Sequence, residues 1–83
     1  MKFSNTDRTL MAMLFQRGTV TEFSGKCTVG GIERTWIVRH IPANDLRRND
    51  MYSAIITGIY GEIICEDTLV GCLDKIEQQI NAA

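Results

Sequence analysis

The chain has 83 residues, which is the length of one small domain, and we expect residues 1–83 to form a single domain. It is 45% hydrophobic and 23% charged with a net charge of −1, a composition that argues against a disordered chain. A chain of this size buries only about 60% of the surface that its unfolded form exposes. Self-association is therefore expected as an added source of stability.

The charges are divided unevenly along the chain. Residues 1–48 hold eight basic and four acidic side chains, whereas residues 49–83 hold one basic and six acidic side chains. This division predicts a dipolar molecule that can dock on a charged partner or on a second copy of itself.

The cysteine pattern and the start of the chain indicate a compartment. Three cysteines (Cys27, Cys65 and Cys72) are an odd number, and none has Cys-x-x-Cys spacing, so we expect reduced, buried thiols. Residues 1–5 become polar at once, unlike a secretory signal, and no apolar run approaches the ~18 residues of a membrane span. The expectation is a cytoplasmic protein with no membrane partner.

The first predicted element is a helix over residues 5–16. Ser4 stands at the N-cap with Asp7 three residues later, and Gly18 stands where a glycine ends a helix. Apolar residues between them recur at helical spacing (Leu10, Met13 and Leu14). The alternative is a first strand over residues 9–15.

A β-hairpin is predicted next. Residues 19–29 alternate between apolar and polar, Gly30-Gly31 suits a tight turn with positive φ, and residues 33–41 form the partner strand. Neither face of residues 33–41 is purely polar, which indicates cover on both sides of the sheet or an interface.

Pro42 ends that strand because it has no N–H to donate. Residues 43–50 are a polar loop with room for one helical turn. Residues 51–59 fit either a strand or a helix, and their β-branched residues favour the strand. A turn at residues 60–62 then leads into a short strand over residues 62–65.

The last predicted element is an amphipathic helix that begins after Asp67, which is expected to be its N-cap. Its apolar stripe and a neighbouring thiol mark the buried side (Leu69, Cys72, Leu73, Ile76 and Ile80). Together these elements predict an α+β fold, with a small antiparallel sheet of three to four strands and an N-terminal and a C-terminal helix packed on it.

No constellation of residues predicts catalysis, a cofactor or a metal. His40 is the one histidine, and the hairpin places Cys27 far along the ladder from it. The four cysteine and histidine side chains lack zinc-ligand spacing, and no glycine-rich phosphate loop is present. We therefore expect no enzyme activity, no catalytic residue, no cofactor and no metal.

A basic group around one tryptophan is the candidate binding site. The predicted contact residues are Arg34, Trp36, Arg39, Arg47 and Arg48. Arginine and tryptophan are the residue types that most often dominate protein interfaces. The same residues could bind phosphates and stack on bases. A third reading is a core tryptophan with arginines at the sheet edge.

Two resemblances accompany these patterns. The expected element order is similar to that of the double-stranded-RNA-binding fold, whose last helix presents a basic start to phosphates. The matching segment here, Glu66-Asp67-Thr68-Leu69, is acidic, so that role does not carry over. Residues 52–80, and Gly61 to Leu69 within them, resemble the strand-to-helix end of HicB-type antitoxin domains, a pattern also found in phage-encoded proteins.

The sequence thus predicts a small non-enzymatic protein that acts by protein–protein contact, as a regulator, inhibitor or accessory factor, with phage- or prophage-type proteins as one candidate class. Its partner is another protein or a second copy in a homodimer. The alternative is a nucleic-acid-binding module that uses the arginines.

Overall fold

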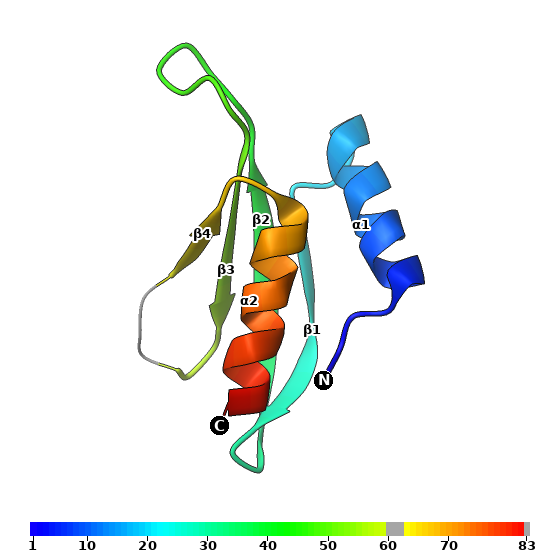
Figure 1. Ribbon diagram of the computed structural model, residues 1–83, viewed down its shortest axis with the longest axis vertical. Coiled ribbons are helices and arrows are strands. Elements are labelled where there is room, and N and C mark those ends of the chain that lie inside the picture. The colour runs from blue at the N-terminus through cyan, green and yellow to red at the C-terminus, as the bar shows by residue number, and fades with distance from the viewer. Residues whose placement is uncertain (60–62, 83) are drawn as a thin grey trace.

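The computed structural model describes residues 1–59 and 63–82. Within them the chain folds in the order α1 (Asn5–Arg17), β1 (Glu22–Val29), β2 (Ile32–Ile41), β3 (Met51–Ile56), β4 (Ile64–Glu66) and α2 (Leu69–Ala82). The strands form one antiparallel sheet in the order β1-β2-β3-β4, and α2 crosses one side of it (Figure 1). The predicted α+β class and both helices are confirmed, with four strands.

Helix α1 begins and ends where the sequence predicts. The Asp7 backbone N–H donates to Ser4 Oγ at 3.0 Å, which satisfies one of the unpaired amides of the first turn. Gly18 ends the helix with φ of 72°, a conformation that costs glycine little. The rival strand over residues 9–15 is wrong, because this cap and this stop fix the segment as a helix.

The hairpin forms as predicted, with different starting points for its strands. Gly30 and Gly31 both have positive φ, 59° and 79°, so a two-residue turn can join β1 to β2. Strand β1 starts at Glu22 rather than at residue 19, because the chain needs residues 18–21 to leave α1. The register pairs Gly25 with Trp36 and Phe23 with Val38.

Residues 51–59 are predicted as a strand or a helix, and the structure shows a strand from Met51 to Ile56. The loop before it contains no helix; Asn44 and Arg47 instead exchange backbone hydrogen bonds across a turn. The predicted strand over residues 62–65 is observed as Ile64–Glu66. The predicted turn at residues 60–62 lies outside the described residues.

Helix α2 is capped one residue later than expected. Thr68 Oγ1 accepts from the Gly71 N–H at 3.1 Å, so Thr68, and not Asp67, is the capping side chain. The predicted apolar stripe is buried in full, and Cys72, Leu73 and Ile76 have no exposed surface.

The sheet has two unlike faces. The side that α2 packs against, here called the covered face, carries Phe23, Trp36, Val38, Ala54 and Ile56, which join the core. The opposite side, the uncovered face, carries no helix in residues 1–59 or 63–82 (Figure 1). The Cα extents of 42 × 27 × 17 Å leave room in the shortest direction for one sheet and one helix layer.

Candidate interaction surfaces

The five predicted contact residues do not lie together. Trp36 is only 7% exposed and sits in the core, where its ring meets that of Phe3 edge-on with the centroids 5.0 Å apart. The folded chain thus leaves little of this indole available for contact with a partner. Of the three sequence readings, the structure places the tryptophan as the core residue.

The arginines point in three directions. Arg34 shares the covered side of β2 with Trp36, and its Nη1 donates to the Thr57 carbonyl at 3.3 Å. Arg39, on the uncovered face, donates from Nε to Glu22 Oε1 at 2.6 Å. Arg47 and Arg48 belong to the loop between β2 and β3, where Arg47 donates to the Pro42 carbonyl. No single basic surface results, and binding of a protein or of nucleic acid through these arginines stays a prediction.

The uncovered face holds an apolar group that the sequence reasoning did not select. Ile37, Ile55 and Ile63, here called the isoleucine patch, surround a shallow hollow of about 180 Å³ with Arg39 and Ser53 at its margin. Ile55 is 42% exposed and Ile63 is 62% exposed. The chain therefore leaves large β-branched side chains in water on a sheet surface that could pack against another surface.

A signal for this patch was present in the sequence. Two pairs of adjacent isoleucines, Ile55-Ile56 and Ile63-Ile64, occur in predicted strands. Because neighbouring residues of a strand point to opposite faces, one isoleucine of each pair must lie on the side away from the core. The structure buries Ile56 and Ile64 and exposes the other two.

The charges on the uncovered face are balanced within the chain. Glu22 pairs with Arg39, and Lys26 Nζ lies 3.7 Å from Glu33 Oε1. Both pairs sit on the β1–β2 side of this face, while the isoleucine patch lies towards β3 and β4. The face thus presents an apolar half and a half whose opposite charges already meet.

An aromatic cluster closes the covered face beside the loop. His40 stacks on Tyr52 with ring centroids 5.0 Å apart, and Phe15 of α1 lies against both rings. His40 Nε2 is 3.3 Å from Asp50 Oδ2. The pKa of Asp50 is lowered, first by the hydrogen bond from the Ala43 N–H and then by His40. Burial, with a smaller contribution from Asp50, raises the pKa of Tyr52.

The three thiols differ from expectation in one case. Cys27 and Cys72 are buried as predicted, but Cys65 is exposed, because it alternates with the buried Ile64 and faces the uncovered side. Burial raises the pKa of Cys72 to about 11 and also raises that of Cys27. A raised pKa disfavours the thiolate, the form that a nucleophile requires.

The described part of the chain lacks two further features, a metal-ligand group and a membrane-spanning helix. Among residues 1–59 and 63–82, no group of three or more histidine, cysteine, aspartate and glutamate side chains could hold a metal ion. No helix in those ranges has both the length and the apolar character needed to cross a membrane.

Comparison with known proteins gives no relative. No family model, no curated protein and no solved structure matches this chain. Any functional statement therefore rests on the geometry of the chain itself.

Proposed function

We propose that this chain is a small non-enzymatic protein that acts by protein–protein contact, and that its first contact is with a second copy of itself. The observation that carries the proposal is the isoleucine patch on the uncovered face. In the proposed dimer, two uncovered faces pack about 10 Å apart, as the sheets of a β-sandwich do. Each helix layer then lies on the outside.

The charge of the uncovered face suits a second copy better than a charged partner. Its charged half carries two ion pairs of opposite sign, Glu22 with Arg39 and Lys26 with Glu33, so the described residues of this half add no net charge that would repel an identical face. A strongly basic or acidic partner would have to break one of these ion pairs in order to bind there. Both copies also gain by removing Ile55 and Ile63 from water.

The size of the face sets the expected affinity. Four strands about 4.8 Å apart, with strands of about 20 Å in length, give a projected area on the order of 300–400 Å². The accessible area of a corrugated surface is larger, yet it stays below the ~800 Å² per partner of a standard interface. We therefore expect a modest dimer with a Kd on the order of micromolar.

Sedimentation equilibrium of the wild type and two variants tests the dimer. In Ile55→Lys, two lysines would meet across the proposed interface, so we expect the Kd to rise at least about tenfold. The matched control is Leu46→Lys, which makes the same kind of change at a loop residue that is 99% exposed. The control should associate like the wild type.

Two results would contradict the proposal. One is a wild type that remains monomeric at about 100 μM, far above a micromolar Kd. The other is equal loss of association in Ile55→Lys and Leu46→Lys, which would mean that added charge rather than the uncovered face controls it. Far-ultraviolet circular dichroism of both variants shows whether each is folded.

A further inference from the structure

The outer edge of β1 presents backbone groups that its own sheet does not use. The His40 N–H donates to the Thr21 carbonyl at 3.1 Å, and the register pairs Glu22 with Arg39. In an antiparallel ladder, hydrogen-bonded pairs alternate with non-bonded pairs. Since Thr21 bonds to His40, the N–H and C=O groups of Glu22 and of every second residue after it point away from β2. These outward residues are Glu22, Ser24, Lys26 and Thr28.

Nothing in residues 1–59 or 63–82 occupies this edge. Strand β1 has no neighbour on that side, and its pairing with β2 runs from Glu22 to Val29 without a bulge. It contains no proline that would block a further strand. Eight residues of edge are thus available for backbone pairing.

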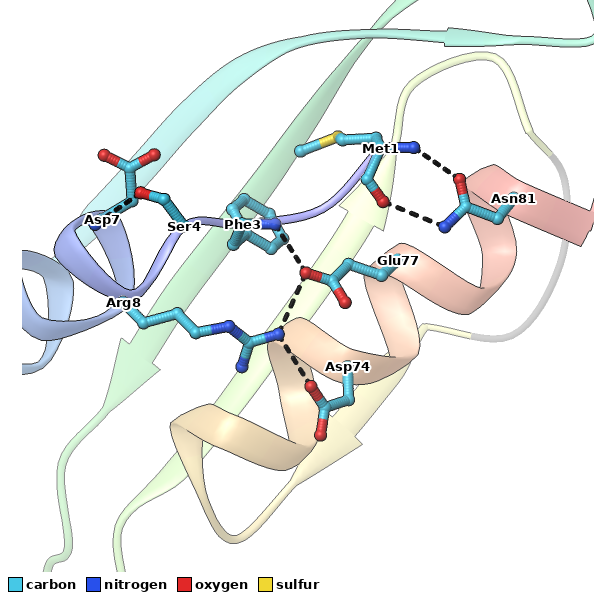
Figure 2. A network of polar contacts seen from close by, with 8 residues as sticks. All are labelled: Met1, Phe3, Ser4, Asp7, Arg8, Asp74, Glu77 and Asn81. Carbon is cyan, nitrogen blue, oxygen red and sulfur yellow. Dashed lines mark hydrogen bonds and ion pairs between the residues drawn. The ribbon is translucent and has the colours of Figure 1, made fainter.

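Helix α1 lies next to this edge of the sheet. Figure 1 shows α1 beyond β1, with no strand behind it. Two contacts fix the rotation of α1: Arg8 reaches Asp74 and Glu77 of α2 (Figure 2), and the Phe15 ring lies 5.0 Å from that of Phe23 on the sheet.

The exposed stripe of α1 faces away from α2. Residues two apart on a helix differ in direction by about 200°, so Leu10 points opposite to Arg8. Leu10 is 50% exposed and Met13 is 43% exposed. They line an open hollow of about 420 Å³ with Thr6 and Thr9. Helix α1, which lies beyond β1, therefore carries an apolar stripe on a side that α2 does not cover.

We propose that the edge of β1 binds an extended segment of a partner protein, which adds a fifth strand to the sheet beside α1. Its outward backbone groups pair with those of Ser24 and Lys26, and every second side chain of the segment is apolar and packs towards Leu10. Main-chain hydrogen bonds supply affinity in this mode of recognition, and alternate side chains supply specificity.

The charge of Lys26 indicates which residues the partner segment should carry on its other side, away from Leu10. Lys26 is about three-quarters exposed, and its contact with the equally exposed Glu33 is 3.7 Å long, so it can turn to an acid opposite it. Glu22 is already held by Arg39 at 2.6 Å. The segment that fits best alternates apolar and polar residues and carries a carboxylate opposite Lys26.

A second copy is a poorer occupant of this edge. Two chains that paired through their β1 edges would place both helix layers on the same side of the joined sheet. Helix α1 already fills the room beside the first half of β1 that the helix layer of the other chain would need (Figure 1). A single strand avoids that collision.

The inference rests on the proposed action by protein contact, but on a different surface, so the two proposals can fail separately. A display library of random linear peptides is selected on the wild-type protein, and enriched peptides are synthesised and titrated by fluorescence anisotropy. Three variants are compared: Ser24→Pro lacks the outward N–H, Ser24→Ala keeps it, and Lys26→Glu reverses the charge.

We expect enriched peptides to alternate apolar and polar residues with an acid on the polar side. Ser24→Pro should weaken binding about tenfold or more, the loss of one hydrogen bond, while Ser24→Ala stays within about threefold of the wild type. Lys26→Glu should weaken binding of the acidic peptides. Sedimentation should show Ser24→Pro dimerising like the wild type, and Ile55→Lys should bind peptides normally.

Either of two outcomes overturns the inference. No peptide is enriched above the level found on an unrelated folded protein, or enriched peptides bind Ser24→Pro and Lys26→Glu as well as they bind the wild type. If Ser24→Pro does not fold, Lys26→Glu decides, because it keeps the backbone N–H and changes only an exposed side chain. This titration is made below the Kd of the proposed dimer, since the Lys26 side chain lies on the uncovered face.

Discussion

At the scale of single residues, Gly25 sets the position of the core tryptophan. A Cβ atom at this position would lie 2.6 Å from Cζ2 of the Trp36 ring, and Phe3 packs edge-on against the same ring. The indole is rigid and cannot move aside without disturbing the core. Gly25→Ala should therefore lower the free energy of unfolding by about 1–3 kcal/mol.

Urea denaturation measures this loss, with Ser24→Ala as the control on the same strand. Ser24 is exposed on the uncovered side, so its truncation should change stability by no more than about 0.5 kcal/mol. A Gly25→Ala protein as stable as the control would mean that the indole does not need this space.

The cysteines give a second prediction at this scale. Cys65 is exposed, whereas Cys72 is fully buried with its pKa raised to about 11 by burial. At a protein concentration below the expected Kd, where the chain is a monomer, iodoacetamide at mildly alkaline pH should label Cys65 in the folded protein and reach Cys27 and Cys72 only after unfolding. Peptide mapping by mass spectrometry separates the sites. Labelling of Cys72 as fast as that of Cys65 would contradict the burial.

Residue patterns predicted some of these positions and could not predict others. Caps and turns could be predicted, because each depends only on residues close to it in the sequence. The examples are Ser4, Gly18 and Gly30-Gly31. The burial of Trp36 depends on its cross-strand neighbour Gly25 and on Phe3 from the opposite end of the chain. Such a relation exists only once the strand register and the docking of the N-terminal segment are set, so the sequence left both a core position and a contact position open for the tryptophan.

At the scale of elements, α1 is held to α2 by a polar network. Arg8 Nη2 donates to Asp74 Oδ1 at 2.8 Å and to Glu77 Oε1 at 3.0 Å, and Glu77 Oε1 also accepts from the Phe3 N–H at 2.6 Å (Figure 2). Asn81 exchanges two further hydrogen bonds with Met1. The Arg8 and Glu77 side chains are mostly shielded from water, so this pair is less screened than a surface pair.

Arg8→Gln should therefore loosen α1. Loss of the charge leaves Glu77 partly buried beside the Phe3 amide, and we expect a cost of about 1–3 kcal/mol. Hydrogen exchange should speed up in α1 more than in α2 or the sheet. Arg17→Gln is the control, because Arg17 is exposed at the last turn of the same helix. Equal exchange in both variants would show that the network does not dock α1.

The loop between β2 and β3 should respond to acid through Asp50. Its folded-state pKa is lowered, first by the Ala43 N–H and then by His40. A lowered pKa adds stability above the unfolded value of about 3.9, and that stability is lost as pH falls through the folded value. The wild type should be more stable than Asp50→Asn near neutrality, and the difference should disappear in acid.

Thermal unfolding of both proteins across acidic pH measures that difference. A constant gap between them would contradict the assignment, because it would not depend on ionisation of this carboxyl group.

Elements were more predictable than the way they assemble. The amphipathic stripe of α2 identified every residue of the helix that the structure buries. By contrast, the sequence of α2 could not predict that Asp74 and Glu77 bind Arg8, since Arg8 lies 66 and 69 residues before them. Likewise, the apolar residues Leu10 and Met13 fit helical spacing, but they lie beside the packed stripe of Met11 and Phe15.

At the scale of the whole molecule, the uneven charge of the chain is partly cancelled within the fold. The basic first half and the acidic second half meet where Arg8 joins α2. The proposed contacts instead use shape and apolar surface: the isoleucine patch on one face for the dimer, and the edge of β1 for a partner segment. Sequence composition could predict self-association in general terms, but only the single helix layer shows which face is open.

The proposed dimer makes a last prediction about the stability of the molecule as a whole. If folded chains associate and unfolded chains do not, mass action makes the melting temperature depend on protein concentration. For a domain of this size, each tenfold increase within the dimeric range should raise Tm by about 3 °C or more. Burial of Ile55 and Ile63 between two copies supplies the coupling.

Calorimetry over a range of concentrations checks this, and the variants assign the effect to a surface. Ile55→Lys should melt at a temperature that does not change with concentration, whereas Leu46→Lys should follow the wild type. Ser24→Pro, altered at the β1 edge, should also keep the dependence. A wild-type Tm that stays constant while Ile55→Lys melts at the same temperature would mean that the uncovered face stays open in solution. Retained dependence in Ile55→Lys would instead place self-association on another surface.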